Sequence, residues 1–150
     1  MRDLGADIIA ISPDGFVAAI DVKNSENLDR QAAIALRKSM ASHGILPHAR
    51  YFLLLSQDQG HLWDGASMKD LDAAPRWSFS MQPIIARYWP GGTLSGRLRG
   101  SELELLVFQW LSDLRNRDDH PKGEAEQAFE ESGLLPSLRE RDLSLSVQVA

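Results

Sequence analysis

The stretch IDVKN, residues 20–24, places an aspartate and a lysine two positions apart in an otherwise apolar segment. Successive side chains of a β-strand point to opposite faces of its sheet, so Asp21 and Lys23 share one face while Val22 points to the other. A carboxylate beside an ammonium group can serve metal-assisted hydrolysis, or it can form a plain ion pair worth about 0–1 kcal/mol. Which of the two applies depends on the other residues of that face.

A second aspartate is expected directly opposite the first. Two apolar, β-branched runs, ADIIAIS and FVAAIDVKN, flank the turn-forming residues Pro13-Asp14-Gly15, and this pattern predicts a β-hairpin. If those three residues form the loop, Ser12 pairs with Phe16, and Asp7 then faces Asp21 with Cβ atoms about 4.5–5.5 Å apart.

Two carboxylates at that distance in a covered sheet repel each other, and one of them tends to take up a proton. A divalent cation reverses the sign of the interaction, and Mg²⁺ prefers oxygen ligands, with waters and phosphates completing its shell. Lys23 beside the pair can orient a water or offset charge on a phosphate. The pattern therefore predicts a metal-assisted phosphodiester site, with a buried ion network without a ligand as the plainer alternative.

The same residues carry a family resemblance. Asp7, then Asp21-Val22-Lys23 on the next strand and then a helix, resembles the PD-(D/E)XK nuclease superfamily, which has the restriction-endonuclease-like fold. The runs GILPHARYFLLLSQDQGHLWD and SELELLVFQWLSDL also resemble small bacterial proteins of that superfamily. The resemblance implies DNA cleavage with Mg²⁺ (or Mn²⁺) bound by Asp7, Asp21 and the Val22 carbonyl, with Lys23 catalytic. Gln31 stands where several members place a supporting glutamine.

Two features depart from the family pattern. Ala6 stands where the motif name has a proline, and only six residues precede Asp7, so the usual N-terminal helix of the core is missing. A shortened chain, a start that lies upstream, or a homodimer or partner subunit covering the gap would each explain this. The alternative to a nuclease is a catalytically inactive nuclease-like scaffold that acts as a binding or assembly module.

The fold expected around these residues is a single α/β domain over residues 1–150, with a mixed central β-sheet flanked by helices. A helix should begin at Ser25 as N-cap and end at Gly44. Its apolar stripe would be Leu28, Ala32, Ala35, Leu36 and Met40, while Arg30, Arg37 and Lys38 would mark its solvated side. Strands should follow at 51–57 and 61–64.

The remainder of the chain is less regular. Residues 65–100 are rich in Pro and Gly and are expected to form an irregular wrapping segment, with a short element at QPIIARYW. Residues 101–115 predict a helix with a Ser101–Glu104 capping box and Trp110 packed on its apolar face. Residues 116–150 should form an acidic extension with a short helix near 123–132 and a final strand in LSLSVQVA.

Composition limits the classes of function. The 150 residues contain 43% hydrophobic and 25% charged residues, as expected for one globular domain, and no cysteine, which excludes disulfides, thiolate zinc sites and a cysteine nucleophile. Neither a signal peptide nor a membrane-spanning run is visible, so a cytoplasmic protein is expected. The net charge of −5 divides into +1 over residues 1–99 and −6 over residues 100–150. A positive face for DNA therefore remains open on the first two thirds of the chain.

Overall fold

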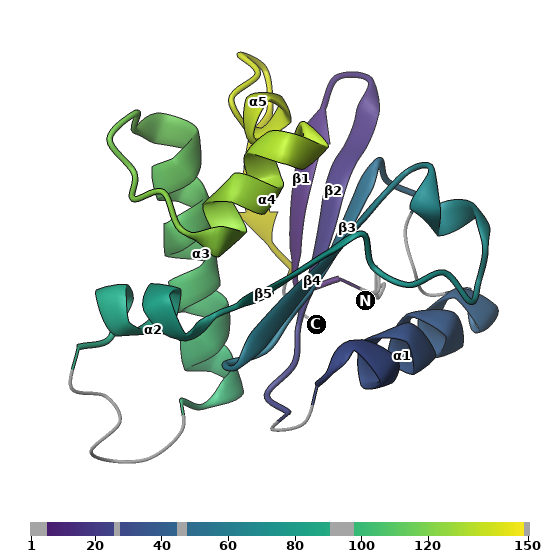
Figure 1. Cartoon of the computed structure of the whole chain (residues 1–150). Helices are drawn as coiled ribbons and strands as arrows, with labels where there is room; N and C mark the ends of the chain where they lie inside the picture. Colours follow the sequence, from purple (N-terminus) through teal and green to yellow (C-terminus); the bar gives the residue numbers. More distant parts are fainter. Residues whose placement is uncertain (1–5, 26–27, 45–47, 91–97, 149–150) are drawn as a thin grey trace.

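The computed structural model describes residues 6–25, 28–44, 48–90 and 98–148. They form a six-stranded mixed sheet in the order β5-β4-β3-β2-β1-β6, in which only β2 and β3 are parallel (Figure 1). The strands are β1 (Ile8–Ser12), β2 (Gly15–Val22), β3 (Tyr51–Leu55), β4 (Gln59–Asp64), β5 (Trp77–Ser80) and β6 (Ser144–Val147). The expected α/β class with a mixed central sheet is confirmed.

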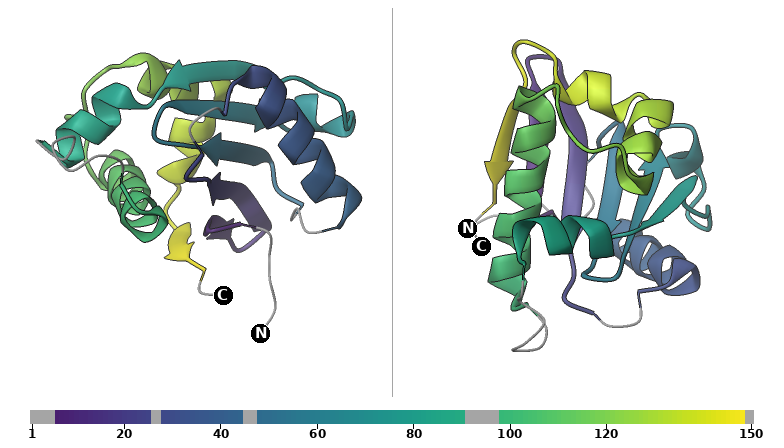
Figure 2. Two further views of the ribbon diagram at one scale, coloured as in Figure 1. Left: turned by 90° about the horizontal axis from the view of Figure 1, so that it is seen from below. Right: turned by 60° about the vertical axis from the view of Figure 1, so that its left-hand side comes forward.

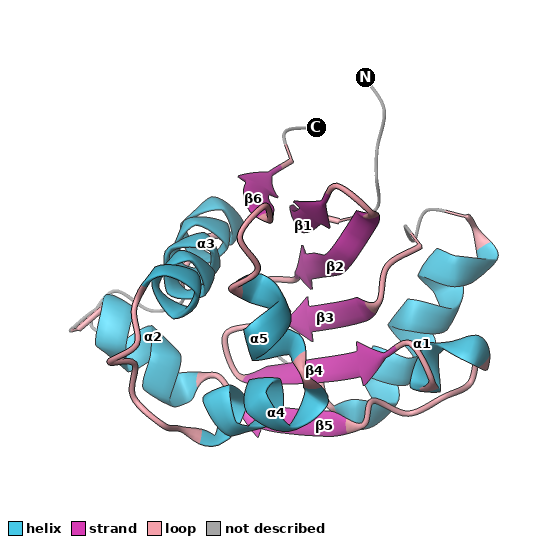
Figure 3. Ribbon diagram, turned by 90° about the horizontal axis from the view of Figure 1, so that it is seen from above, coloured by secondary structure: helices cyan, strands magenta, loops and turns pink. Residues whose placement is uncertain are grey.

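Helices cover both faces of the sheet (Figure 2). One face carries α1 (Arg30–Ser42), and the short 3₁₀ helix η1 (Ser67–Lys69) lies in the connection from β4 to β5. The other face carries α2 (Gln82–Tyr88), α3 (Gly100–Asn116), α4 (Glu124–Ser132) and α5 (Leu134–Leu138) (Figure 3). In the described part of the chain, which starts at Ala6, no helix precedes β1.

The alternation of side chains along the central strands produces two cores. Ile8 and Ile20, which are neighbours across the hairpin, point into the larger core under α3, α4 and α5, where Trp110 is fully buried. Ile9 and Ala19 point into the smaller core on the side of α1. Because both faces are covered, β1 and β2 are apolar at nearly every position, as the sequence predicts.

The hairpin turn is tighter than expected, yet the register beyond it is the expected one. Ser12 pairs with Gly15 rather than with Phe16, so only Pro13 and Asp14 form the loop. Gly15 adopts φ 129°, a conformation that residues with a side chain rarely adopt. A bulge next to Ile11 adds one residue to β2, after which Ala10 pairs with Ala18. The bulge restores the alignment that brings Asp7 opposite Asp21.

Three helix predictions are corrected. Helix α1 is capped by Asp29, whose carboxylate accepts a hydrogen bond from the Ala32 N–H at 2.8 Å, and not by Ser25. Arg37 is buried, with 2% of its surface exposed, rather than solvated. At the start of α3 the carboxylate of Glu102, not of Glu104, accepts a hydrogen bond from the backbone N–H at the cap.

The described parts of the segment 65–100 are more regular than its Pro and Gly content predicts, while residues 91–97 lie outside the described residues. Besides α2, which matches the expected element at QPIIARYW, it contains η1 and the edge strand β5. Gly60 of β4 faces Phe79 of β5, and a Cβ at Gly60 would lie 2.2 Å from the Phe79 ring. The prediction of an irregular segment was wrong because β5 has only four residues and depends on this long-range contact rather than on a local pattern.

Candidate functional site

Asp7 and Asp21 meet where β2 ends and β1 begins. The Asp7 N–H donates to the Ile20 carbonyl at 2.9 Å, and the Asp7 Oδ2 accepts a hydrogen bond from the Val22 N–H at 2.7 Å. The Asp7 carboxyl group adjoins that of Asp21 and helps to raise its pKa. The structure thus brings the two aspartates together, and Val22 provides the backbone group that anchors the first of them.

Lys23 completes the group at the rim of the sheet. Its Nζ lies 3.2 Å from the Asp21 Oδ2, and 41% of its side chain is exposed, against 5% of the Asp21 side chain. Its backbone N–H donates to the Leu55 carbonyl at 2.8 Å, which extends the parallel pairing of β2 and β3 by one residue. The lysine is therefore fixed at its backbone while its ammonium group reaches solvent.

Burial disfavours the ionised form of the Asp21 carboxyl group. Its pKa is raised from 3.8 to about 7, first because the carboxyl group is buried and then because the Asp7 carboxyl adjoins it, while Lys23 partly opposes the shift. Within the described residues the Oδ2 atom of Asp21 accepts no hydrogen bond of good geometry, although the Lys23 ammonium lies nearby. A buried carboxylate oxygen with one ion-pair contact and no hydrogen bond has a lone pair available for a cation.

A metal at this position would have to draw on more than side chains. Across residues 6–148, leaving aside the gaps in the described ranges, no three His, Cys, Asp or Glu residues are grouped so as to hold a metal ion alone. Two carboxylates and a backbone carbonyl still match the usual protein share of a Mg²⁺ shell, which waters and phosphate oxygens complete.

Glu104 is a neighbour of the site that the sequence reasoning missed. It belongs to α3, on the opposite side of the sheet from α1, and its pKa is raised first by burial and then by the charge of Asp7. The sequence pattern assigned Glu104 to a capping box, but Glu102 makes that contact, and Glu104 instead feels the charge of Asp7. No signal in the sequence pairs residues 97 positions apart in this way.

A buried glutamine ties together two loops beside the site. The Gln57 amide nitrogen donates to the Asn24 Oδ1 at 2.8 Å and to the Leu98 carbonyl at 3.0 Å, and its oxygen accepts from the Leu98 N–H at 3.1 Å. Asn24 directly follows Lys23. The sequence placed Gln57 at the end of a strand and gave no reason to expect this contact.

Gln31 is not part of this cluster. It lies in the first turn of α1 with an exposed side chain, and among the described residues that side chain makes no hydrogen bond. A supporting role for Gln31 therefore rests only on the sequence resemblance.

The comparisons with known proteins provide no family for the chain. No protein-family model matches it, and neither the curated proteins nor the solved structures gave a significant match. Among the described residues, no helix is long and apolar enough to cross a membrane.

Proposed function

We propose that the protein is a metal-dependent nuclease that hydrolyses DNA phosphodiester bonds. Mg²⁺, or Mn²⁺, would be held by Asp7 and Asp21 with the Val22 carbonyl, and Lys23 would assist the attacking water. The observation that carries the proposal is the adjacency of two carboxyl groups and one ammonium group where β1 and β2 meet, with the Asp21 Oδ2 lacking a hydrogen bond. The resemblance to PD-(D/E)XK nucleases agrees with it.

The donor set fits a hard divalent cation. A carboxylate with a pKa of about 7 costs free energy to ionise, and a divalent cation next to it recovers that cost. A metal held by these residues would supply charge stabilisation at the phosphate and would lower the pKa of a bound water. Asp21 must give up its proton to bind the metal, so metal binding should tighten as the pH rises toward 8.

Lys23 is positioned for a role at the phosphate. Its ammonium group is half-exposed at the edge of the sheet and next to the carboxylates, so a phosphate approaching Asp21 would meet it. There it would orient the attacking water or stabilise negative charge that develops on the phosphate oxygens. In the absence of metal it partly neutralises Asp21.

The alternative is the inactive scaffold, and one observation favours it. The Asp7 Oδ2 already accepts a hydrogen bond from the Val22 N–H at 2.7 Å, and Lys23 already lies beside Asp21. The charged and polar atoms of the site are therefore partly paired with one another without a metal. In that case Asp21 and Lys23 would serve only to fix the end of β2.

Nicking of supercoiled DNA tests the choice between the two. The wild-type protein should nick DNA with Mg²⁺ or Mn²⁺ and lose the activity in EDTA, and Asp21→Ala or Lys23→Ala should each lower the rate by at least about 100-fold. Lys122→Ala, which removes an exposed lysine far from the site, should leave the rate unchanged. Equal rates for all these variants, or no divalent-dependent nicking, would support the scaffold instead.

A further inference from the structure

A hollow lies near the start of β2, at the opposite end of that strand from Asp21. This distal cavity has a volume of about 1050 Å³, and its walls include Phe16, Arg37, His48, Arg50, Lys69 and Leu71. Phe16 is near the start of β2 and Asp21 near its end, so these two residues are about 17 Å apart along the strand. Ligand pockets in proteins have volumes of about 300–1,000 Å³, so the space suits a small molecule.

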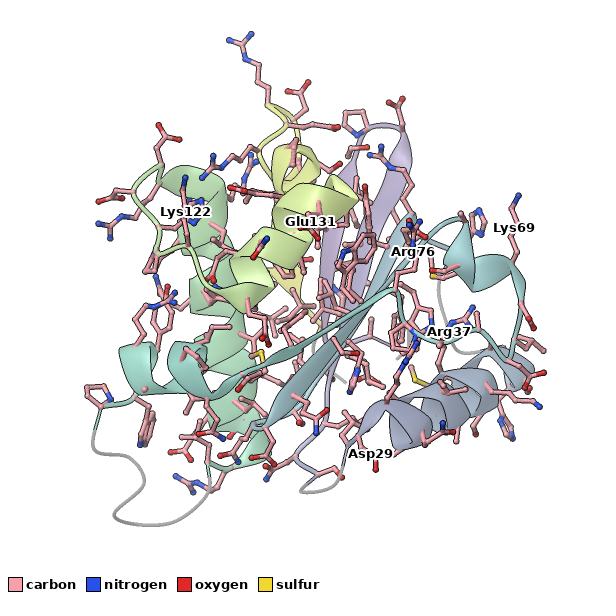
Figure 4. All side chains as sticks on the ribbon, viewed as in Figure 1. Asp29, Arg37, Lys69, Arg76, Lys122 and Glu131 are labelled. Atoms are coloured by element: carbon pink, nitrogen blue, oxygen red, sulfur yellow. The ribbon has the colours of Figure 1, made fainter. Side chains whose placement is uncertain are left out.

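Arg37 gives the distal cavity a buried positive charge. Its two terminal nitrogens donate to the carbonyls of Met68 and Asp70 at 2.6 and 2.9 Å, and its guanidinium carbon lies 5.6 Å from the centre of the Trp63 ring. The Nε atom is buried and, within the described residues, has no hydrogen-bond partner. Figure 4 shows Arg37 between α1 and the segment that follows β4.

A buried charge without a carboxylate in contact is costly, and an anion nearby lowers that cost. Among the described residues, no carboxylate oxygen lies within ion-pair distance of Arg37. Burial lowers its pKa, and the charge of Asp70 opposes this shift from a distance. Arg37 therefore contributes an attractive field to the cavity, while its two terminal nitrogens remain bonded to backbone carbonyls.

The rim offers cations that can contact a ligand directly. Lys69 and His48 are exposed and, in the described structure, have neither a hydrogen bond nor an ion pair. Arg50 lies 3.8 Å from Glu140, a loose contact with both side chains about half exposed. Over the whole lining of the cavity, Arg37, Arg50 and Lys69 outnumber the acids Asp14 and Glu140, which leaves a net charge of +1.

The rim also has an apolar part. Leu71 is one of two large hydrophobic residues that the described structure leaves exposed, with 45% of its surface accessible. It lines the cavity together with Phe16 and Met68. A flat apolar group bound here would cover Leu71, and the removal of both apolar surfaces from water would favour binding.

We propose that the distal cavity binds a phosphate monoester that carries a flat apolar group, a ligand of the nucleotide class. The phosphate lies among Lys69, His48 and Arg50 in the field of Arg37, and the flat group lies against Phe16 and Leu71. The site is independent of the nuclease proposal, since it shares no residue with the aspartate pair.

Amide NMR with adenosine 5′-monophosphate as the probe tests the proposal. The backbone amides of Gly15 and Gly65, both in the wall of the cavity, should shift saturably with a Kd of about 1 mM or tighter. Adenosine and inorganic phosphate should each bind more weakly, because each lacks half of the contacts. No saturable shift at these glycines, or equal affinity for adenosine, would overturn the proposal.

Two matched lysine variants locate the phosphate. Lys69→Met should weaken binding by about 10-fold, the loss expected for one charged contact, while Lys122→Met should not change it. Lys69 and Lys122 are both exposed, and they lie on opposite sides of the molecule (Figure 4). Both substitutions remove one positive charge, so an equal effect of the two would show non-specific attraction and refute the site. Nuclease activity plays no part in either readout.

Discussion

Among single residues, Asp21 has the clearest conflict between stability and its proposed function. A carboxyl group whose pKa is raised from 3.8 to about 7 on folding binds its proton more tightly in the folded state. Its favourable contribution is fully present below about pH 4 and is lost as the pH rises through 7. Ionising this buried carboxyl group near neutral pH costs free energy of folding. Such a cost is expected where the ionised carboxylate is needed, as at a metal site.

Asp21→Asn should therefore stabilise the protein at pH 8, by about 1–3 kcal/mol, while it abolishes nicking. The amide keeps the shape of the side chain and removes the charge that burial disfavours. At pH 4, where the wild-type carboxyl is already neutral, the two proteins should unfold at nearly the same urea concentration. Urea denaturation at both pH values measures this difference.

Asp64→Asn is the matched control with the opposite sign. Burial tends to raise the pKa of Asp64, but hydrogen bonds from Ser67 and the charge of Arg76 outweigh it, and the pKa is lowered. Its contribution is present above the usual pKa and is lost as the pH falls, so the asparagine variant should be less stable at pH 8. Destabilisation by Asp21→Asn at pH 8 would contradict the conclusion that the ionised Asp21 carboxylate destabilises the fold.

At the scale of strands and helices, the elements that the sequence predicts correctly are those encoded by local residue patterns. The hairpin follows from a turn signal between two apolar runs, and α3 follows from its apolar stripe, so both are confirmed within a few residues. The meeting of Asp7 and Asp21 follows from hairpin register alone. This part of the site needs only contacts between residues close in sequence.

What the sequence did not predict depends on contacts between distant residues. The sequence pattern places Arg37 on the solvated side of its helix. Its burial is explained only by its hydrogen bonds to the carbonyls of Met68 and Asp70, which follow β4 in the chain. Glu104 approaches Asp7 only because α3 packs on the sheet. Strand β5 is too short to show a pattern of its own, and its place depends on packing across β4.

The pairing of β5 with β4 can be tested at Gly60. A Cβ there would lie 2.2 Å from the Phe79 Cε1 and 2.8 Å from the Leu55 Cδ2, so the Phe79 ring would have to move out of the core. Gly60→Ala should lower the free energy of unfolding by about 1–3 kcal/mol, the usual cost of overpacking. Thermal or urea denaturation measures the loss.

Gly100→Ala is the control for this substitution. A Cβ at Gly100, in the first turn of α3, meets no atom within 4 Å, and alanine favours a helix over glycine. The variant should be as stable as the wild type or slightly more stable. Similar losses at the two positions would show that close packing against Phe79 does not hold β5 in place.

For the molecule as a whole, the sheet joins the beginning of the chain to its end. Strand β6 pairs with β1, Ile8 lies opposite Val147, and the Gln148 N–H donates to the Asp7 carbonyl at 2.7 Å. The C-terminal strand therefore braces the backbone that carries one of the two aspartates. Contacts so far apart in sequence cost much loop entropy and are expected to form late in folding.

A chain that ends at Asp142 tests this closure. It lacks β6 and the buried Leu143, and it leaves one edge of β1 unpaired, so it should lose at least about 3 kcal/mol in the free energy of unfolding. A chain that ends at Gln148 keeps the strand and should match the full-length protein in urea denaturation. Because β6 holds Asp7 through Gln148, nicking per folded molecule should also fall in the shorter chain. If stability drops while that activity stays, β6 supports the fold alone and the aspartate pair holds its geometry from the hairpin.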